Sequence, residues 1–111
     1  MIENKIKSAI KSYPNFPIEG IIFKDLLPIL ENPEIFSELI KNMSVSKIIK
    51  EADVLIGIDA RGFLFAAAIA FNIKKPLIVA RKPNKLPGEL IERSYILEYG
   101  SNSLSMQKDV V

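Results

Sequence analysis

The stretch Val54-Leu-Ile-Gly-Ile-Asp-Ala-Arg-Gly-Phe-Leu-Phe65 decides the fold of this 111-residue chain. Its first five residues form a β-branched run that is typical of a buried strand, and Phe63–Phe71 is apolar on every side, which is typical of a buried helix. A strand that turns directly into a helix leaves the first N–H groups of the helix unpaired, beyond the carboxyl end of the strand. We therefore predict an α/β fold with a small anion-binding pocket at this turn.

The residues of the turn suit such a pocket. Arg61 offers a charged fork, Gly62 allows a ligand or a neighbouring backbone to come close, and Asp59 can bind a hydroxyl or orient the arginine. Ligands of open α/β sheets bind at this edge. The alternative is an ordinary turn in which Asp59 caps the helix and Arg61 is solvated, and the stretch alone does not decide between the two.

The composition indicates one domain with a hydrophobic core, because 49% of the residues are hydrophobic and the net charge is only +2. Nothing in the charge pattern favours a nucleic-acid partner. The sequence has no cysteine and no histidine, which excludes disulfides, thiolate nucleophiles, the usual zinc sites and a Ser-His-Asp triad. Catalysis would use carboxylates, lysines, arginines, tyrosines, backbone amides or a metal that arrives with the substrate.

The longest apolar stretch, Phe63–Phe71, is too short to span a bilayer, and the first five residues do not resemble a signal peptide. We therefore expect a cytoplasmic protein without membrane contact.

The part of the chain before the turn predicts two helices and an extended segment. Apolar residues at helical spacing predict a helix over residues 2–12, followed by a loop over residues 13–20 that two prolines and a glycine enforce. Residues 21–27 have an extended pattern that Pro28 ends, and within it core packing of Phe23 is favoured over a role as a lid on a planar ligand. Asn32-Pro33 predicts the start of a helix that runs to about Glu51, with an interruption near Ser44-Val-Ser46.

After the central helix, whose C-cap is predicted at Asn72, Leu77–Arg81 predicts a second strand parallel to the first. Arg61 and Arg81 then lie at the same edge of the sheet. Residues 82–88 form a cationic loop, and Ile91–Tyr99 with Leu104–Met106 predicts an antiparallel ribbon turning at Gly100-Ser-Asn102. A surface hairpin and a loop that closes over a phosphate both fit, and the clustered cations favour the second. Two parallel strands make a poor sheet, so the domain is expected to be incomplete.

Several segments together resemble the adenine phosphoribosyltransferases, which belong to the type I phosphoribosyltransferase family. The matching segments are Phe16-Pro-Ile-Glu-Gly-Ile-Ile-Phe-Lys-Asp25, Gly57-Ile-Asp-Ala-Arg-Gly-Phe63, Arg81-Lys-Pro-Asn-Lys-Leu-Pro-Gly88, Ser94-Tyr95 and Leu97-Glu-Tyr-Gly100. The resemblance covers Ile2 to Asp109. It implies a Rossmann-like parallel sheet with an N-terminal hood segment and an antiparallel flexible ribbon, as a single truncated domain over residues 1–111.

The resemblance also implies an activity: transfer of a 5-phosphoribosyl group from phosphoribosyl pyrophosphate to N9 of adenine, giving AMP and pyrophosphate, in purine salvage. Mg²⁺ would arrive with the phosphoribosyl pyrophosphate, without a metal site of the protein. A homodimer is implied as well.

The residue roles that the resemblance implies fall into four groups. The groups are adenine binding by Ile22, Phe23 and Lys24; pyrophosphate binding by Asp59, Ala60, Arg61, Arg81, Lys82 and Lys85; catalysis by Glu98 and Arg61; and loop closure by Tyr95 and Tyr99. The last three pyrophosphate cations would reach the site of a neighbouring subunit. A strained peptide bond is implied between Asp59 and Ala60. Lys24 stands where the family usually has arginine, which keeps the charge but loses the planar fork.

Members of the family continue past the ribbon into a strand with an acidic pair and a loop that cradles the 5-phosphate, which this sequence lacks. Three hypotheses therefore remain open: an adenine phosphoribosyltransferase or its N-terminal part, a non-catalytic purine- or pyrophosphate-binding remnant or one piece of a split enzyme, and a related transferase for another purine.

Overall fold

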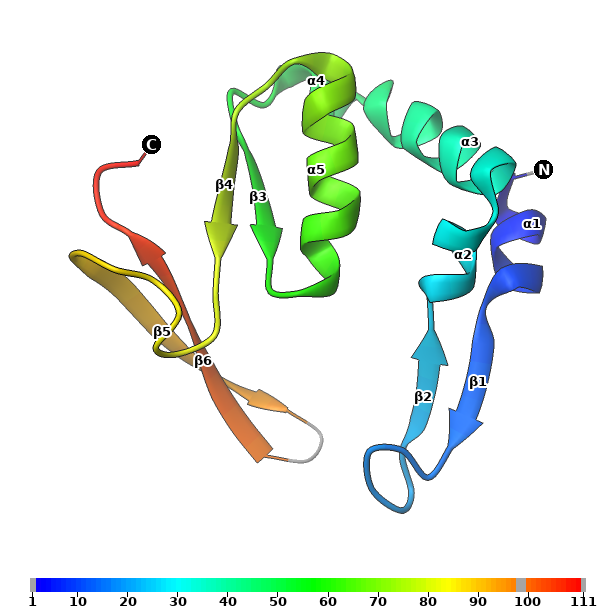
Figure 1. Cartoon of the computed structure of the whole chain (residues 1–111), viewed down its shortest axis with the longest axis horizontal. Coiled ribbons are helices and arrows are strands. Elements are labelled where there is room, and N and C mark those ends of the chain that lie inside the picture. Colours follow the sequence, from blue (N-terminus) through cyan, green and yellow to red (C-terminus); the bar gives the residue numbers. More distant parts are fainter. Residues whose placement is uncertain (1, 98–99, 111) are drawn as a thin grey trace. The chain divides into compact units, whose positions relative to one another are not determined.

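The computed structural model describes residues 2–97 and 100–110, which contain both helices and strands (Figure 1). The chain divides into two compact units, residues 1–43 and residues 44–111, each with its own internal contacts. The single domain expected over residues 1–111 stays a prediction.

The first unit carries three helices and a short hairpin within its described residues. Its elements are α1 (Ile2–Ala9), β1 (Lys11–Pro14), β2 (Ile22–Asp25), α2 (Leu27–Glu31) and α3 (Pro33–Ser44). β1 and β2 run antiparallel, with Tyr13 opposite Phe23 (Figure 1). The prediction of a helix over residues 2–12 is therefore too long, because α1 ends at Ala9. The loop predicted from residue 13 begins only after Pro14, where β1 ends. The reason is that β1 is stabilised by hydrogen bonds to β2, a partner that the local pattern of residues 11–14 does not reveal.

The extended segment predicted over residues 21–27 is also too long. It ends at Asp25, whose carboxylate Oδ1 accepts a hydrogen bond from the Leu27 N–H at 3.0 Å, and α2 begins at Leu27. Pro28 lies in the first turn of α2, where a helix needs no N–H from that residue. The proline thus begins a helix instead of merely ending a strand.

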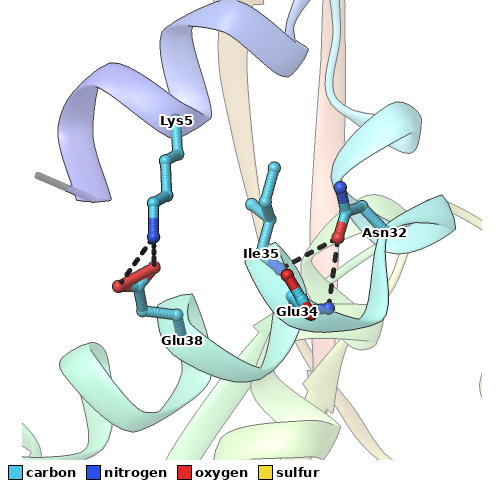
Figure 2. A network of polar contacts seen from close by, with 5 residues as sticks. All are labelled: Lys5, Asn32, Glu34, Ile35 and Glu38. Carbon is cyan, nitrogen blue, oxygen red and sulfur yellow. Dashed lines mark hydrogen bonds and ion pairs between the residues drawn. The ribbon is translucent and has the colours of Figure 1, made fainter.

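The predicted start of α3 is confirmed. The Asn32 side-chain oxygen accepts hydrogen bonds from the N–H groups of Glu34 and Ile35, at 3.1 and 3.2 Å, which is an N-cap (Figure 2). The Lys5 ammonium on α1 lies 3.1 Å from the Glu38 carboxylate on α3 (Figure 2). Both side chains of this ion pair are largely exposed, so it adds little to stability. The interruption predicted near residues 44–46 is confirmed by the separate helix that follows.

The second unit contains the predicted strand–helix–strand arrangement. Its elements are α4 (Lys47–Glu51), β3 (Leu55–Ile58), α5 (Arg61–Ile73), β4 (Leu77–Ala80), β5 (Leu90–Leu97) and β6 (Gly100–Gln107). β3 and β4 are parallel, with Gly57 opposite Val79, and α5 packs alongside them (Figure 1). The α/β fold with a parallel sheet and an antiparallel ribbon is confirmed.

Gly57 lets α5 approach β3 closely. A Cβ atom at this position would stand 3.2 Å from the Ala66 Cβ and 3.3 Å from the Phe63 Cδ1, both shorter than ordinary contact. The inner face of α5 buries Ile69 and Ala70. A larger residue in the middle of β3 would push the helix away, and the turn at the helix start would move with it.

The all-round burial predicted for the central helix is wrong for its outer face, where Leu64 is 44% and Phe71 88% exposed. Burial depends on what packs against each side, which the apolar composition alone does not show. The predicted C-cap at Asn72 is wrong as well. α5 continues to Ile73, and Lys74 ends it in a left-handed conformation with φ 58°.

The ribbon forms a regular antiparallel pair, in which Leu97 is paired with Gly100. The turn predicted at Gly100-Ser-Asn102 is therefore wrong, because these residues already belong to β6. The ribbon is joined to the end of β4 through Arg81 and Ser105, which exchange backbone hydrogen bonds of 2.9 and 2.8 Å. Among the described residues, no helix is long and apolar enough to cross a membrane.

Candidate functional site at the β3–α5 turn

The turn between β3 and α5 is short. The Asp59 N–H donates to the Ala80 carbonyl at 2.9 Å, which extends the pairing with β4 by one residue. The Asp59–Ala60 peptide bond is cis. Ala60 occupies the N-cap position of α5, and no side chain caps the helix. The alternative in which Asp59 caps α5 is therefore wrong.

The Asp59 carboxylate instead faces the end of the neighbouring strand. Its Oδ2 accepts a hydrogen bond from the Arg81 Nε at 3.2 Å and one from the Lys82 backbone N–H at 3.3 Å. The Asp59 side chain is only 6% exposed, whereas that of Arg81 is 33% exposed. The two strand ends are thus tied together by one partly buried ion pair.

The aromatic ring of Phe63, in the first turn of α5, forms the other side of this arrangement. The Arg81 Cζ lies 5.6 Å from the centre of that ring, within the range of a cation–π contact. The guanidinium therefore has a carboxylate and an aromatic ring as neighbours.

The ion pair changes the acidity of Asp59. Burial acts to raise the pKa of the Asp59 carboxyl, but the hydrogen bond from the Lys82 N–H, the hydrogen bond from Arg81 and the positive charges of both residues outweigh burial and lower the pKa below its ordinary value. The carboxylate is therefore charged at neutral pH.

The predicted pyrophosphate residues fall into three groups in the structure. Asp59, Arg81 and Lys82 are in contact. Ala60 and Arg61 follow directly in the same turn with exposed side chains. Lys85, in the segment between β4 and β5, is exposed and makes no hydrogen bond or ion pair with residues 2–97 or 100–110. Arg61, Arg81 and Lys82 therefore lie at the strand ends where an anion pocket is predicted, and the pocket itself stays a prediction.

The predicted adenine residues lie on β2, in the other unit. The ring of Phe23 meets that of Phe16 edge to face, with centroids 5.1 Å apart, and Phe23 is half-buried. The Lys24 ammonium donates to the Ser12 hydroxyl at 2.8 Å, and Ile22 is exposed. Phe23 thus packs against Phe16 and is only half-buried, so it is not part of a deep core.

Two further predicted residues, Glu98 and Tyr99, lie outside the described residues. Tyr95 is on β5, opposite Asn102, and is half-exposed. In residues 2–97 and 100–110, no group of three or more acidic side chains is arranged to hold a metal ion.

Sequence reasoning missed three contacts of this site: the Asp59–Arg81 pair, the Phe63 ring against Arg81, and the link from Arg81 to Ser105. The first could have been found, because an acid and a base that follow two adjacent parallel strands meet at one edge. The other two depend on the angle of α5 and on the register of β6, for which the sequence carries no local signal.

The match to known proteins covers nearly the whole chain, although no family model matches it. An adenine phosphoribosyltransferase of Prochlorococcus marinus (strain MIT 9215) is 57% identical over 109 residues, which are 98% of this chain. This chain is a homologue of the adenine phosphoribosyltransferases. The Mycoplasma mobile enzyme of the same name is 47% identical over 108 residues.

Solved adenine phosphoribosyltransferases have the same fold. The Saccharomyces cerevisiae protein, solved with adenine and an imino-altritol bisphosphate, is 38% identical with a TM-score of 0.86, over 99% of this chain and 65% of that one. The Giardia lamblia protein, solved with 9-deazaadenine, is 28% identical with a TM-score of 0.92, over 100% of this chain and 62% of that one. The chain spans about 63% of the length of the Prochlorococcus relative.

Proposed function

We propose that this chain acts in adenine phosphoribosyl transfer, in which AMP and pyrophosphate are made from adenine and phosphoribosyl pyrophosphate for purine salvage. The observation that carries the proposal is the identity of 57% with an adenine phosphoribosyltransferase over 98% of the chain. The bond from the ribose C1 to pyrophosphate breaks, a bond from C1 to N9 forms, and the N9 proton leaves.

The cations at the strand ends support this chemistry. Negative charge builds on the pyrophosphate as it leaves, and preorganised positive groups stabilise that charge. Arg61 and the backbone N–H groups in the first turn of α5 are suited to this task. Lys82 and Lys85 add positive charge from the segment that follows β4. Mg²⁺ would arrive on the phosphoribosyl pyrophosphate, as part of the substrate.

The remaining roles rest on the resemblance. Adenine would bind at Ile22, Phe23 and Lys24 on β2, with its base against the Phe23 ring. Glu98 would handle the N9 proton. Tyr95 and Tyr99 would take part in closure of the ribbon, which excludes water that competes with adenine for the ribose. A homodimer and a cytoplasmic location belong to the same proposal.

A second candidate is a non-catalytic purine- or pyrophosphate-binding protein, or one piece of a split enzyme. It is favoured by one observation: Arg61, Lys82 and Lys85 are exposed near the strand ends, and exposed cations can bind a pyrophosphate whether or not transfer follows.

The test measures AMP formation from adenine and magnesium phosphoribosyl pyrophosphate by two proteins. One is the 111-residue chain itself. The other is a chimera in which this chain replaces the matching 109 residues of the Prochlorococcus enzyme, with that enzyme as the positive control. We expect the chimera to make AMP, and Arg61→Gln in the chimera to abolish most of this activity.

The outcomes separate the candidates. A folded chimera that makes no AMP while the parent enzyme does contradicts the proposed transfer. Saturable adenine binding by the 111-residue chain in that case, lost in Phe23→Ala, supports the binding protein. Competition among adenine, guanine, hypoxanthine and xanthine tests the base, and a preference for guanine contradicts adenine as the substrate.

A further inference from the structure

Arg81 joins three elements of the second unit. Its backbone exchanges two hydrogen bonds with Ser105 on β6. Its side chain donates from Nε to Asp59, at the end of β3, and packs on the Phe63 ring in the first turn of α5. Ser105 is only 1% exposed, so the backbone link is in the interior. One residue thus connects the ribbon, the parallel sheet and the helix.

The contacts of Arg81 also fix the start of the segment that follows it in the chain. Arg81 directly precedes the cationic segment 82–88, and the Lys82 N–H donates to the same Asp59 oxygen. An arginine side chain has many rotamers, and fixing it in advance removes an entropic cost that ligand binding would otherwise carry. The backbone at the start of the segment, at Lys82, is thereby held by Asp59.

Only one of the guanidinium's donors is used by this arrangement. A guanidinium has five N–H groups, and within residues 2–97 and 100–110 the side chain of Arg81 donates only from Nε. Its charge is partly exposed, since a third of the side chain is accessible. Asp59 and Phe63 therefore hold Arg81 without occupying all its donors.

We propose that Asp59 and Phe63 are positioning residues: they fix Arg81 and the base of segment 82–88 against the β3–α5 turn, so that the cations of the segment meet the leaving pyrophosphate from a preset place. This rests on the proposed function, and it differs from the direct pyrophosphate contact that the resemblance assigns to Asp59.

The first experiment is a double-mutant cycle in the chimera with Asp59→Asn and Arg81→Gln. We expect each single variant to raise the KM for phosphoribosyl pyrophosphate about tenfold and to leave the KM for adenine unchanged. The double variant is expected to be no worse than the worse single variant, because the two residues act as one unit. Single effects that multiply in the double variant overturn the proposal. Arg81→Lys keeps the charge without the Nε donor and should not restore the KM.

The matched control is Asp53→Asn. Asp53 precedes β3 at its other end, is exposed, and makes no hydrogen bond with the described residues. The same chemical change at Asp53 should leave both KM values unaltered.

The second experiment needs no activity, so it separates failure of this proposal from failure of the proposed function. Trypsin cleaves the 111-residue chain after Lys85 in the segment and after Lys74 at the end of α5, and mass spectrometry gives both rates. In Asp59→Asn and in Phe63→Leu, the ratio of cleavage at Lys85 to cleavage at Lys74 should rise several-fold over that of the wild type and of Asp53→Asn. An unchanged ratio in both variants overturns the positioning role, and a chimera without activity contradicts only the proposed function. A variant that unfolds raises both rates together, and the other variant then decides.

Discussion

Each end of the β3–β4 pair has one cation with defined hydrogen bonds, and the two cations differ in how many of their N–H donors these bonds use. At the amino end, the Lys75 ammonium donates to the carbonyls of Ile49, Lys50 and Ala52, the first at 2.8 Å, where α4 ends. An ammonium has three donors, so all of them are engaged. At the carboxyl end, Arg81 donates from Nε to Asp59, and its other side-chain donors make no hydrogen bond to residues 2–97 or 100–110.

The difference teaches how to tell a structural cation from one that is suited to a ligand. Lys75 complements the negative end of a helix and has no donor left for another acceptor. Arg81 contacts a carboxylate and an aromatic ring, and the remaining N–H donors of its guanidinium could bind a ligand. Exposed cations and the N–H groups of the first turn of α5 lie at the same end of the sheet. The carboxyl end of the sheet is therefore where substitutions should change activity, and the amino end is where they should change stability alone.

The largest effect should come from Arg61→Gln in the chimera. We expect kcat to fall by about 10²- to 10³-fold, because a positive group aimed at a leaving anion is lost. Steady-state kinetics of AMP formation checks this. Lys50→Gln, an exposed cation at the amino end, serves as the control and should keep the full rate. A similar fall of kcat in Lys50→Gln would contradict the inference that only substitutions at the carboxyl end of the sheet change activity.

Substitutions at two glycines near the turn, Gly57 and Gly62, should differ in their effect on the stability of the protein. Gly57→Val should destabilise the protein by about 1–3 kcal/mol, because its side chain would overlap Ala66 and Phe63. Gly62→Ala adds a Cβ at an ordinary 3.6 Å from the Ile58 Cβ, and it should leave the stability unchanged or raise it by up to about 1 kcal/mol. Denaturant unfolding measures both. If Gly62→Ala stays stable but loses phosphoribosyl pyrophosphate affinity, a ligand approaches the backbone there.

A smaller effect is expected at the amino end. Lys75→Met removes three hydrogen bonds to the end of α4, and the protein should lose about 1 kcal/mol of stability, since water replaces the ammonium at carbonyls near the surface. The kinetic constants of the chimera should not move. Thermal unfolding and steady-state kinetics of the same preparation test the two statements together, and a change in KM would contradict a purely structural role.

The smallest effect concerns pH. The pKa of Asp59 is lowered in the folded protein, so the pairing of Asp59 contributes stability above the ordinary pKa of an aspartate, and this contribution is lost as the pH falls through the lowered pKa, below about pH 4. The difference in thermal midpoint between wild type and Asp59→Asn should therefore be full at pH 7 and shrink towards pH 3. A difference that stays constant over this range would show that the charge of Asp59 is not involved.

The local patterns of the sequence predicted the elements whose signals are strong. The strand around Ile56, the helix after it and the N-cap at Asn32 follow from periodicity and capping chemistry. The failures have several causes. β1 and the exposure of the outer face of α5 depend on what other parts of the chain pack against them, and the start of β6 at Gly100 depends on the register of the ribbon. α2 depends on a proline whose position suits both the end of a strand and the first turn of a helix.

The sequence by itself determined the strand–turn–helix around Asp59 and the placement of Arg81 at the same edge, because short-range periodicity and parallel pairing follow from residue types. It also carried the resemblance to adenine phosphoribosyltransferases. Only the tertiary structure decided which partner Asp59 takes. A carboxylate at a helix start can cap the helix or pair with a nearby cation, and the choice depends on the distance to the neighbouring strand end. Here the Arg81 Nε, whose guanidinium lies beside the Phe63 ring, is 3.2 Å from the Asp59 Oδ2, and Asp59 forms the ion pair.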